Sequence, residues 1–166
     1  MPMNLQEKIK EASRLSEILA GLKKNGKKVV FTNGCFDILH PGHLFYLNEA
    51  RTLGDLLVVG INNDASVRNL KGEDRPVNPE KDRALMLAGL SCVDFVTFFG
   101  EPNPYNLIAL LKPDVLVKGG DWTPDRIIGA ALVEKEGGKV LSLPFKPGYS
   151  TTGLIEKIVA LYGKTR

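Results

Sequence analysis

The chain has 166 residues, a net charge of +3, 43% hydrophobic residues and 25% charged residues. These values are ordinary for a soluble globular protein, and the charge is too small to indicate a nucleic-acid partner. The two cysteines cannot build a disulfide framework and favour a reducing compartment. Since no stretch resembles a signal sequence or a transmembrane helix, we expect a cytoplasmic protein with no membrane or nucleic-acid partner.

The N-terminal part of the chain predicts a single helix. Apolar side chains recur every three or four positions over residues 5–24, and Asn25 and Gly26 end the pattern. We therefore expect one domain over residues 1–166, in which a helical extension (1–26) precedes a catalytic core (27–166).

The most informative segment joins an apolar strand at residues 29–31 to a helix at about residues 41–52. Pro41 suits the first helical position, where its missing N–H costs nothing. It also holds His40 in an extended conformation just before the helix. His43 then falls in the first helical turn.

Two imidazoles are thus expected at the positive end of a helix dipole, and Gly42 between them lets a ligand approach the backbone. This pattern predicts an anion site in which His40 and His43 donate hydrogen bonds to a phosphate whose charge is growing. Two alternatives remain. The histidines could bind a metal ion together with Cys35, or they could simply cap a helix at the surface.

Strands and helices alternate along the rest of the chain. The expected strands cover residues 56–61, 95–98, 114–118 and 139–143. The expected helices follow residues 62–64, cover 80–90, 103–112 and 123–136, and begin again at 150, while 71–79 is expected to be a loop. This order predicts an α/β fold with a parallel sheet covered on both faces. Ligands bind such sheets at the carboxyl ends of the strands, where polar residues gather at 32–43, 62–64, 119–122 and 150–152.

The string Gly-Cys-Phe-Asp-Ile-Leu-His-Pro-Gly-His at residues 34–43 resembles the nucleotidylyltransferases that carry an HxGH motif, in particular their cytidylyltransferase-like branch. The resemblance covers about residues 27–160. It implies a Rossmann-like, doubly wound sheet of five parallel strands in the order 3-2-1-4-5, in three α/β/α layers. Such enzymes transfer a nucleotide from a nucleoside triphosphate to a phosphorylated acceptor.

Within this family, the adenylyltransferases that act on D-glycero-D-manno-heptose 1-phosphate are the most similar. The implied reaction uses ATP and a phosphorylated sugar and gives ADP-heptose and pyrophosphate. The implied cofactor is Mg²⁺, bound by the ATP phosphates with no side-chain ligand assigned. The alternative substrate pairs are glycerol 3-phosphate with CTP, and phosphopantetheine or another phosphorylated acceptor with ATP. A nucleotide sensor without chemistry and a hydrolytic metalloenzyme are alternatives of other classes.

Site residues follow from the strand ends and from the resemblance together. The expected catalytic residues are His40, His43 and Lys71. The expected nucleotide-binding residues are Asn33, Gly34, Cys35, Phe36, Gly42, Lys118, Gly120, Asp121, Ser150, Thr151 and Thr152. The expected substrate-binding residues are Asp37, Asn62, Asp64, Arg75, Arg83 and Trp122.

Several of these residues have a simpler interpretation. Lys71 and Arg75 could belong to a solvated loop, Arg83 could face solvent, and Trp122 could pack into the core at a turn. The hydroxyls at 150–152 could cap a helix without binding anything. Asp37 could hold Mg²⁺, orient a histidine or contact the acceptor. Relatives carry an arginine shortly before the Ser-Thr-Thr motif, where this chain has Lys146.

Residues 89–99 are strongly apolar and include Phe95, Phe98 and Phe99. The third strand is an edge in the implied order, and an apolar edge needs a cover. We therefore predict a two-fold symmetric homodimer through this segment and the helix before it. The alternative is that the N-terminal helix or a local loop covers the edge within one chain.

Overall fold

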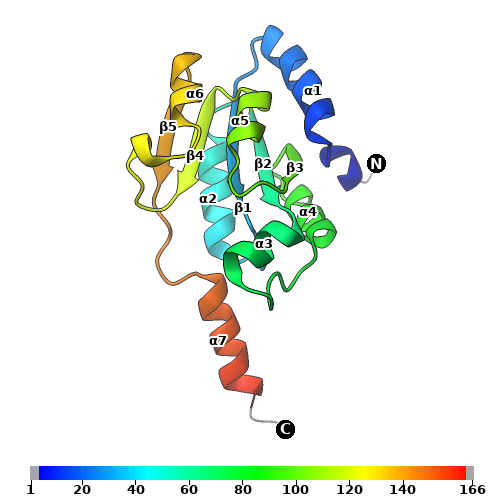
Figure 1. Ribbon diagram of the computed structural model, residues 1–166, viewed down its shortest axis with the longest axis vertical. Coiled ribbons are helices and arrows are strands. Elements are labelled where there is room, and N and C mark those ends of the chain that lie inside the picture. Colours follow the sequence, from blue (N-terminus) through cyan, green and yellow to red (C-terminus); the bar gives the residue numbers. More distant parts are fainter. Residues whose placement is uncertain (1–3, 164–166) are drawn as a thin grey trace.

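The computed structural model describes residues 4–163 and contains one sheet of five parallel strands (Figure 1). The strand order is β3-β2-β1-β4-β5, which confirms the predicted topology. The strands are β1 (Val29–Gly34), β2 (Leu56–Asn62), β3 (Phe95–Phe99), β4 (Val115–Gly119) and β5 (Lys139–Leu143). The winding direction reverses at β1, so ligands are expected at its carboxyl end.

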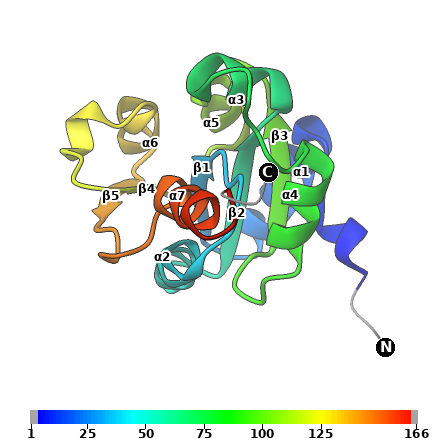
Figure 2. The ribbon, with the colours of Figure 1, turned by 90° about the horizontal axis from the view of Figure 1, so that it is seen from below.

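Helices cover both faces of the sheet, as Figure 2 shows from below. Alternate residues of β1 face opposite layers, because successive strand side chains point to opposite sides. Val30 packs in one core cluster with α2 (Pro41–Arg51) and α4 (Glu80–Ala88). Its neighbours Val29 and Phe31 pack in the other, with α1 (Ala12–Lys24), α5 (Tyr105–Leu111) and α6 (Ala130–Lys135). The molecule therefore has the expected three α/β/α layers.

Two further helices lie toward the carboxyl edge of the sheet. Helix α3 (Asp64–Lys71) follows β2 directly, so Lys71 is its last residue and not part of the following loop. Helix α7 (Thr151–Tyr162) begins at this edge, extends away from the sheet (Figure 1) and has no buried residue.

The single N-terminal helix predicted over residues 5–24 is wrong. A 3₁₀ turn, η1 (Leu5–Lys8), is separated from α1 by an extended segment in which Ile9 forms a parallel bridge with Val96 of β3. The backbone N–H of Lys10 donates to the Val96 carbonyl at 3.0 Å. The open edge of β3 offers unpaired backbone groups, and pairing with them outweighs the helical pattern.

This bridge bears on the predicted homodimer, because it covers part of the β3 edge within one chain. Phe98 is half-buried against the core cluster that contains α4. The homodimer stays a prediction, but an uncovered edge no longer argues for it where Ile9 and Lys10 lie.

The helix predicted over residues 123–136 is also interrupted. A short 3₁₀ turn, η2 (Pro124–Arg126), is followed by Gly129, whose φ of +90° lies in the left-handed region. A Cβ at Gly129 would lie only 2.7 Å from Cδ1 of Ile108, so close packing of this turn on α5 requires glycine. Helix α6 begins only after it. Within residues 4–163 no helix is long and apolar enough to span a bilayer.

Candidate functional site

A cavity of about 620 Å³ opens at the carboxyl ends of the central strands, a size typical of small-molecule sites. Most of the predicted site residues line it together. They are Asn33, Gly34, Cys35, Phe36, Asp37, His40, Gly42, His43, Asn62, Lys71, Arg75, Lys118, Ser150, Thr151 and Thr152. Residues more than a hundred positions apart thus meet at the predicted edge.

The loop after β1 makes a sharp turn that places an aromatic ring against one histidine. Phe36 has a φ of +47°, in the left-handed region that residues other than glycine rarely adopt. Its ring covers Gly34, where a Cβ would lie 3.0 Å from Phe36 Cε2. The same ring lies 5.2 Å from the imidazole of His43. Phe36 therefore shields His43 from water on that side.

The two imidazoles are stacked, with ring centroids 3.8 Å apart and planes inclined by 17°. Nδ1 of each ring is buried without a hydrogen-bond partner among the described residues. Since both rings line the cavity, the Nε2 edges are the ones left to face a ligand. Burial, together with the charge of His40, lowers the pKa of His43 to about 4. Burial also lowers the pKa of His40, against an opposing backbone hydrogen bond. Both rings are therefore neutral at pH 7.

The backbone around the histidines offers fewer free N–H groups to an anion than the sequence suggests. The N–H of His43 is already bonded to the His40 carbonyl at 2.9 Å, so it is not free for an anion. Gly42 is buried, and a Cβ there would lie 2.9 Å from Cβ of Tyr149 and 3.0 Å from Nδ1 of His40. Glycine at this position lets the segment before α7 pack onto the first turn of α2.

The start of α7 lies at the same cavity and offers backbone N–H groups to it. Ser150 is extended and caps the helix, because its Oγ accepts a hydrogen bond from the Gly153 N–H at 3.0 Å. The N–H groups of Thr151 and Thr152 have no hydrogen-bond partner among the described residues, and free N–H groups at a helix N-terminus favour phosphate. A hydroxyl cap and a phosphate site are therefore compatible here.

Two lysines bring positive charge to the cavity. Lys118 lies near the end of β4, and burial lowers the pKa of its ammonium, with a further contribution from the nearby Lys71. Cys35 lies close to both, and burial raises the pKa of its thiol despite the surrounding cations. The thiol is therefore protonated at neutral pH and acts as a neutral part of the wall.

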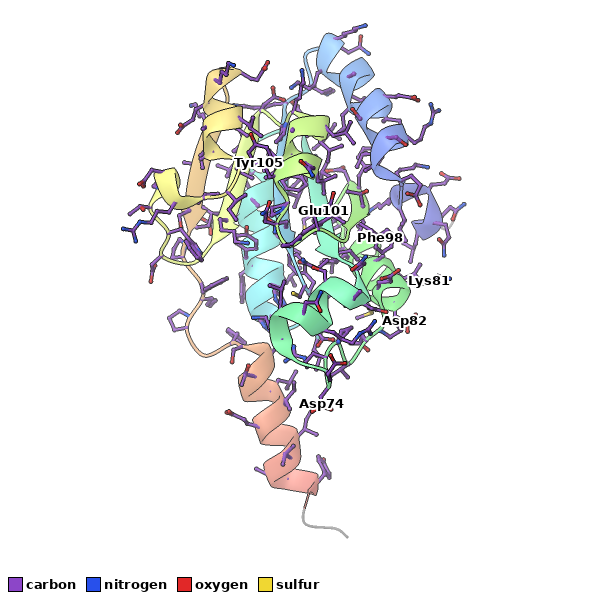
Figure 3. The ribbon with its side chains drawn as sticks, in the orientation of Figure 1. Asp74, Lys81, Asp82, Phe98, Glu101 and Tyr105 are labelled. Atoms are coloured by element: carbon purple, nitrogen blue, oxygen red, sulfur yellow. The ribbon has the colours of Figure 1, made fainter. Side chains whose placement is uncertain are left out.

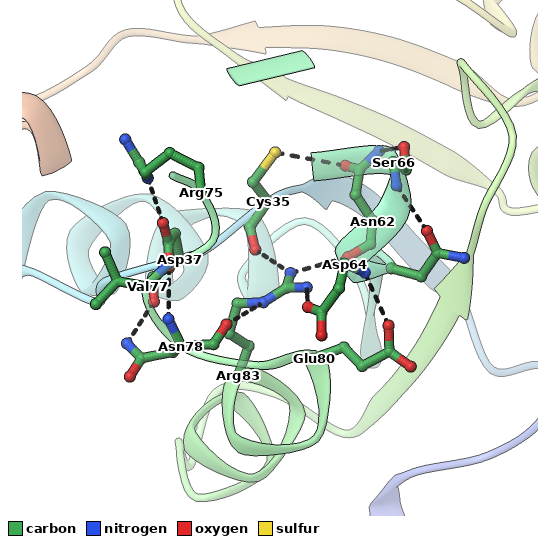
Figure 4. A network of polar contacts seen from close by, with 11 residues as sticks. Cys35, Asp37, Asn62, Asp64, Ser66, Arg75, Val77, Asn78, Glu80 and Arg83 are labelled. Carbon is green, nitrogen blue, oxygen red and sulfur yellow. Dashed lines mark hydrogen bonds and ion pairs between the residues drawn. The ribbon is translucent and has the colours of Figure 1, made fainter. Parts of the chain in front are cut away.

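Arg83 neither lines the cavity nor faces solvent. Both interpretations from the sequence, a substrate-binding side chain and a solvent-facing one, are therefore corrected. Arg83 is 1% exposed, and its guanidinium donates to the carbonyls of Cys35 at 2.6 Å, Asn62 at 2.8 Å and Asn78 at 3.0 Å, and to the carboxylate of Asp64 at 2.8 Å (Figure 4). With four bonds made, little of the guanidinium is left for a ligand. Arg83 ties together the ends of β1 and β2, and Asp64 serves as its partner.

Asp37 anchors the segment between α3 and α4. Its carboxylate accepts hydrogen bonds from Arg75 Nε at 2.5 Å and from the backbone N–H groups of Val77 at 2.8 Å and Asn78 at 3.0 Å (Figure 4). Burial by itself raises the pKa of this carboxyl, but these bonds outweigh it and hold the pKa below its ordinary value. Asp37 therefore fixes Arg75 at the cavity wall rather than orienting a histidine.

The segment after β4 reaches the cavity only in part. Lys118 and Gly119 line it, whereas Gly120, Asp121 and Trp122 do not. Trp122 is 49% exposed, so the alternative of a core-packed tryptophan is wrong as well. Ser142 of β5 holds this turn, since its Oγ donates to the Gly120 carbonyl and accepts from the Trp122 N–H.

Several lining residues were missed from the sequence. They are Tyr46, Leu70, Phe99, Pro102, Asn103, Pro104, Ile128, Phe145 and Tyr149, while Lys146, raised only as an arginine substitute, lines the cavity too. Phe99 ends β3, and Pro102, Asn103 and Pro104 follow it. The rule that placed residues at the ends of the other strands at this edge could have identified them. Among the described residues, no three His, Cys, Asp or Glu side chains are grouped to hold a metal ion.

A family profile described as cytidylyltransferase-like matches residues 31–157, from β1 into α7. The chain belongs to the cytidylyltransferase-like family. It is therefore a nucleotidyltransferase. The segment that matches the family contains both histidines and the hydroxyls that begin α7.

Curated relatives of this cytidylyltransferase-like chain include bifunctional proteins HldE. That of Trichlorobacter lovleyi is 54% identical over 155 residues, and that of Geobacter sulfurreducens is 54% identical over 157 residues. These matches cover 93% and 95% of the chain but 32% of each relative, so the chain spans about a third of their length.

Two solved structures share the fold. A lipopolysaccharide core biosynthesis protein from Thermoplasma volcanium is 31% identical with a TM-score of 0.58, covering 72% of this chain and 97% of that one. A pantoate-beta-alanine ligase from Francisella tularensis has the same TM-score at 17% identity, covering 87% of this chain and 69% of that one. The second likeness concerns the fold alone.

Proposed function

We propose that the chain transfers AMP from ATP to a sugar 1-phosphate, D-glycero-D-manno-heptose 1-phosphate, and releases pyrophosphate. The observation that carries this proposal is that the stacked pair His40 and His43 shares one cavity with the free N-terminus of α7 and with Lys71 and Lys118. Such a cavity offers neutral donors to one phosphate and positive charge to its neighbours.

In the proposed reaction, an oxygen of the acceptor phosphate attacks the α-phosphorus of ATP. A new P–O bond forms there while the bond to the oxygen bridging the α- and β-phosphates breaks, and pyrophosphate leaves with that electron pair. No protein nucleophile is needed, because the acceptor is already an anion. The chain contributes by positioning the two phosphates and by donating hydrogen bonds to the α-phosphate as its charge grows.

Mg²⁺ is part of the proposal as a partner of ATP. The carboxylate of Asp37 lines the cavity but is occupied by Arg75, Val77 and Asn78. No residue is therefore assigned to the ion, which the triphosphate oxygens and water would hold. Bound there, Mg²⁺ would neutralise part of the triphosphate charge.

The acceptor is supported by the relatives. The similar bifunctional proteins HldE and the Thermoplasma volcanium protein of lipopolysaccharide core biosynthesis point to a sugar phosphate of that pathway. The product would be ADP-heptose for lipopolysaccharide or other surface glycans. Because the family is described as cytidylyltransferase-like, transfer of CMP from CTP to glycerol 3-phosphate is the second candidate.

Pyrophosphate release tests these candidates together. The protein is incubated with Mg²⁺, with ATP or CTP, and with a panel containing both anomers of the heptose 1-phosphate, mannose 1-phosphate, glycerol 3-phosphate and phosphopantetheine. We expect release with ATP and the heptose phosphate well above every other pair. Release with CTP and glycerol 3-phosphate alone supports the second candidate, and nucleotide binding without any release identifies a sensor.

A further inference from the structure

The cavity wall divides into two halves on either side of β1. On the side of β4 and β5 lie Lys118, Gly119, Ile128, Phe145, Lys146, Tyr149 and the residues that begin α7. On the side of β2 and β3 lie Asn62, Leu70, Lys71, Arg75, Phe99, Pro102, Asn103 and Pro104. If the proposed function is correct, the triphosphate belongs with the free N–H groups of α7, which leaves the second half for the acceptor.

This acceptor half combines two charged groups with a mainly apolar surface. Its charged groups are Lys71 and Arg75, which suit a phosphate. Leu70, Phe99 and the two prolines add apolar surface, and the polar atoms of Asn62 are engaged with Ser66 and Cys35. Such a surface fits a ligand with one anionic end and a neutral carbon skeleton.

Asn103 is the uncharged polar side chain of this half that keeps a free donor, whereas Lys71 and Arg75 are its charged donors. It lies between Pro102 and Pro104 in the turn that Glu101 and Tyr105 flank in Figure 3. Its Oδ1 accepts a hydrogen bond from the Tyr105 N–H at 3.0 Å, which orients the amide. Its Nδ2 has no hydrogen-bond partner among the described residues.

The turn that carries Asn103 is held against α3. The Asn63 N–H donates to the Phe99 carbonyl at 2.9 Å, and the Ser66 hydroxyl donates to the Glu101 carbonyl at 3.5 Å. A Cβ at Gly100 would lie 2.5 Å from Nδ2 of Asn63, so the turn fits closely there. Asn103 therefore lies in a turn that is fixed in position by hydrogen bonds and close packing, as a residue that selects a ligand requires.

We propose that Asn103 determines acceptor specificity, by donating a hydrogen bond from Nδ2 to a hydroxyl of the acceptor while Phe99, Pro102 and Pro104 pack on its carbon skeleton. The acceptor class is a phosphorylated neutral polyol, that is, a sugar phosphate. A site built to hydrogen-bond a hydroxyl discriminates against ligands that lack it, because its donor is then left unpaired.

Asn103→Asp is the sharpest test, because the carboxylate keeps an oxygen for the Tyr105 N–H and replaces the donor by an acceptor. Asn103→Ser also keeps a hydroxyl that can accept from the Tyr105 N–H but is too short to reach the ligand, and it adds no charge. Asn106→Asp is the matched control, since Asn106 is exposed on α5, just after this turn, and does not line the cavity. Thermal unfolding establishes that all three variants are folded.

Steady-state pyrophosphate release is measured with ATP and D-glycero-D-manno-heptose 1-phosphate. We expect both Asn103 variants to raise the KM for the sugar phosphate about tenfold, the loss of about 1.4 kcal/mol of binding. The KM for ATP stays within twofold, and Asn106→Asp changes neither. If the Asn103 variants leave the KM for the sugar phosphate unchanged, or raise the KM for ATP equally, the inference about Asn103 is wrong while the proposed function stands. Absence of release by the unmodified protein with every sugar phosphate overturns the proposed function, and the inference with it.

Discussion

The imidazole rings of His40 and His43 lie face to face, with their centroids 3.8 Å apart. Two positive charges at that separation repel strongly, and each ring has lost water on its Nδ1 side. The pair is therefore neutral in the free protein, and each ring carries one N–H that it can donate. Neutral donors favour a phosphate that gains charge in the transition state without binding the ground state too tightly.

The first prediction concerns turnover. In His43→Ala, we expect the turnover number to fall about a hundredfold, because one well-placed donor in a site of low polarity is worth roughly 3 kcal/mol. The KM for ATP should change much less, since the cationic and helix N-terminal contacts remain. Rates of pyrophosphate release measure both quantities. Turnover within a few-fold of the unmodified protein would exclude this role.

The second prediction concerns stability in acid. The pKa of His43 is about 4 in the folded chain, below the value of 6.5 for an unperturbed histidine, and that of His40 is lowered too. The unfolded chain therefore takes up protons first as the pH falls. The stability contributed by the neutral rings is complete above pH 6.5 and is lost as the pH falls from there toward 4.

The double variant His40→Gln, His43→Gln tests this, because the chain has only two histidines and the variant has none left to titrate. We expect its melting temperature to fall less between pH 7 and pH 5 than that of the unmodified protein. Calorimetry in buffers of equal ionic strength measures the difference. Parallel decreases in the two proteins would contradict the lowered pKa values.

The parallel strands and most of the site edge could be predicted, because buried parallel strands have continuous apolar runs and polar residues follow their carboxyl ends. The strand order followed only from the resemblance to the HxGH nucleotidylyltransferases, since spacing alone does not show it. Arg83 illustrates what could not be predicted. Its spacing on α4 is compatible with a solvent-facing or a ligand-facing side chain. Its burial depends on three backbone carbonyls that meet only in the folded chain.

The prediction of a single N-terminal helix was wrong for a similar reason. Apolar spacing over residues 5–24 is helical, but the pattern does not reveal that β3 leaves an unpaired edge within reach of Ile9. Asn103 is a different case, because its place after the third strand could have located it at the site edge, although asparagine between prolines is typical of any turn. For Arg83 and for Ile9, a contact between segments distant in sequence determined the outcome.

The third prediction concerns Asp37, whose side chain is 1% exposed and paired with Arg75. Asp37→Asn should destabilise the chain by about 3 kcal/mol, because the arginine and two backbone N–H groups lose a charged acceptor. Since the pKa of Asp37 is lowered on folding, this contribution is present above about pH 4, the usual aspartate value, and is lost as the pH falls through the folded value.

Urea unfolding at pH 7 and pH 3 measures the free energy of unfolding of Asp37→Asn and of the unmodified protein. The difference between the two proteins should be smaller at pH 3 than at pH 7. Asp74→Asn is the control, because Asp74 is exposed in the same segment and has no ion-pair partner among the described residues. Equal stability of the two variants at pH 7 would show that Asp37 does not anchor the segment.

The last prediction concerns Lys146, whose ammonium lies 3.6 Å from the centre of the Phe45 ring. Lys146 lines the cavity together with Ser150. Phe45 is 47% exposed on α2 and also contacts the ring of Tyr149. We expect the ring to hold the lysine toward the triphosphate, in a cation–π contact worth about 0.5–1 kcal/mol.

A double-mutant cycle tests this arrangement. Lys146→Met should raise the KM for ATP severalfold, Phe45→Leu should raise it less, and the combined variant should be no worse than Lys146→Met alone. Leu44→Ala is the control, as a neighbouring side chain of α2 that is 48% exposed and does not line the cavity. Fully additive effects would mean that Phe45 acts independently of Lys146. No effect of either change would remove Lys146 from the nucleotide site.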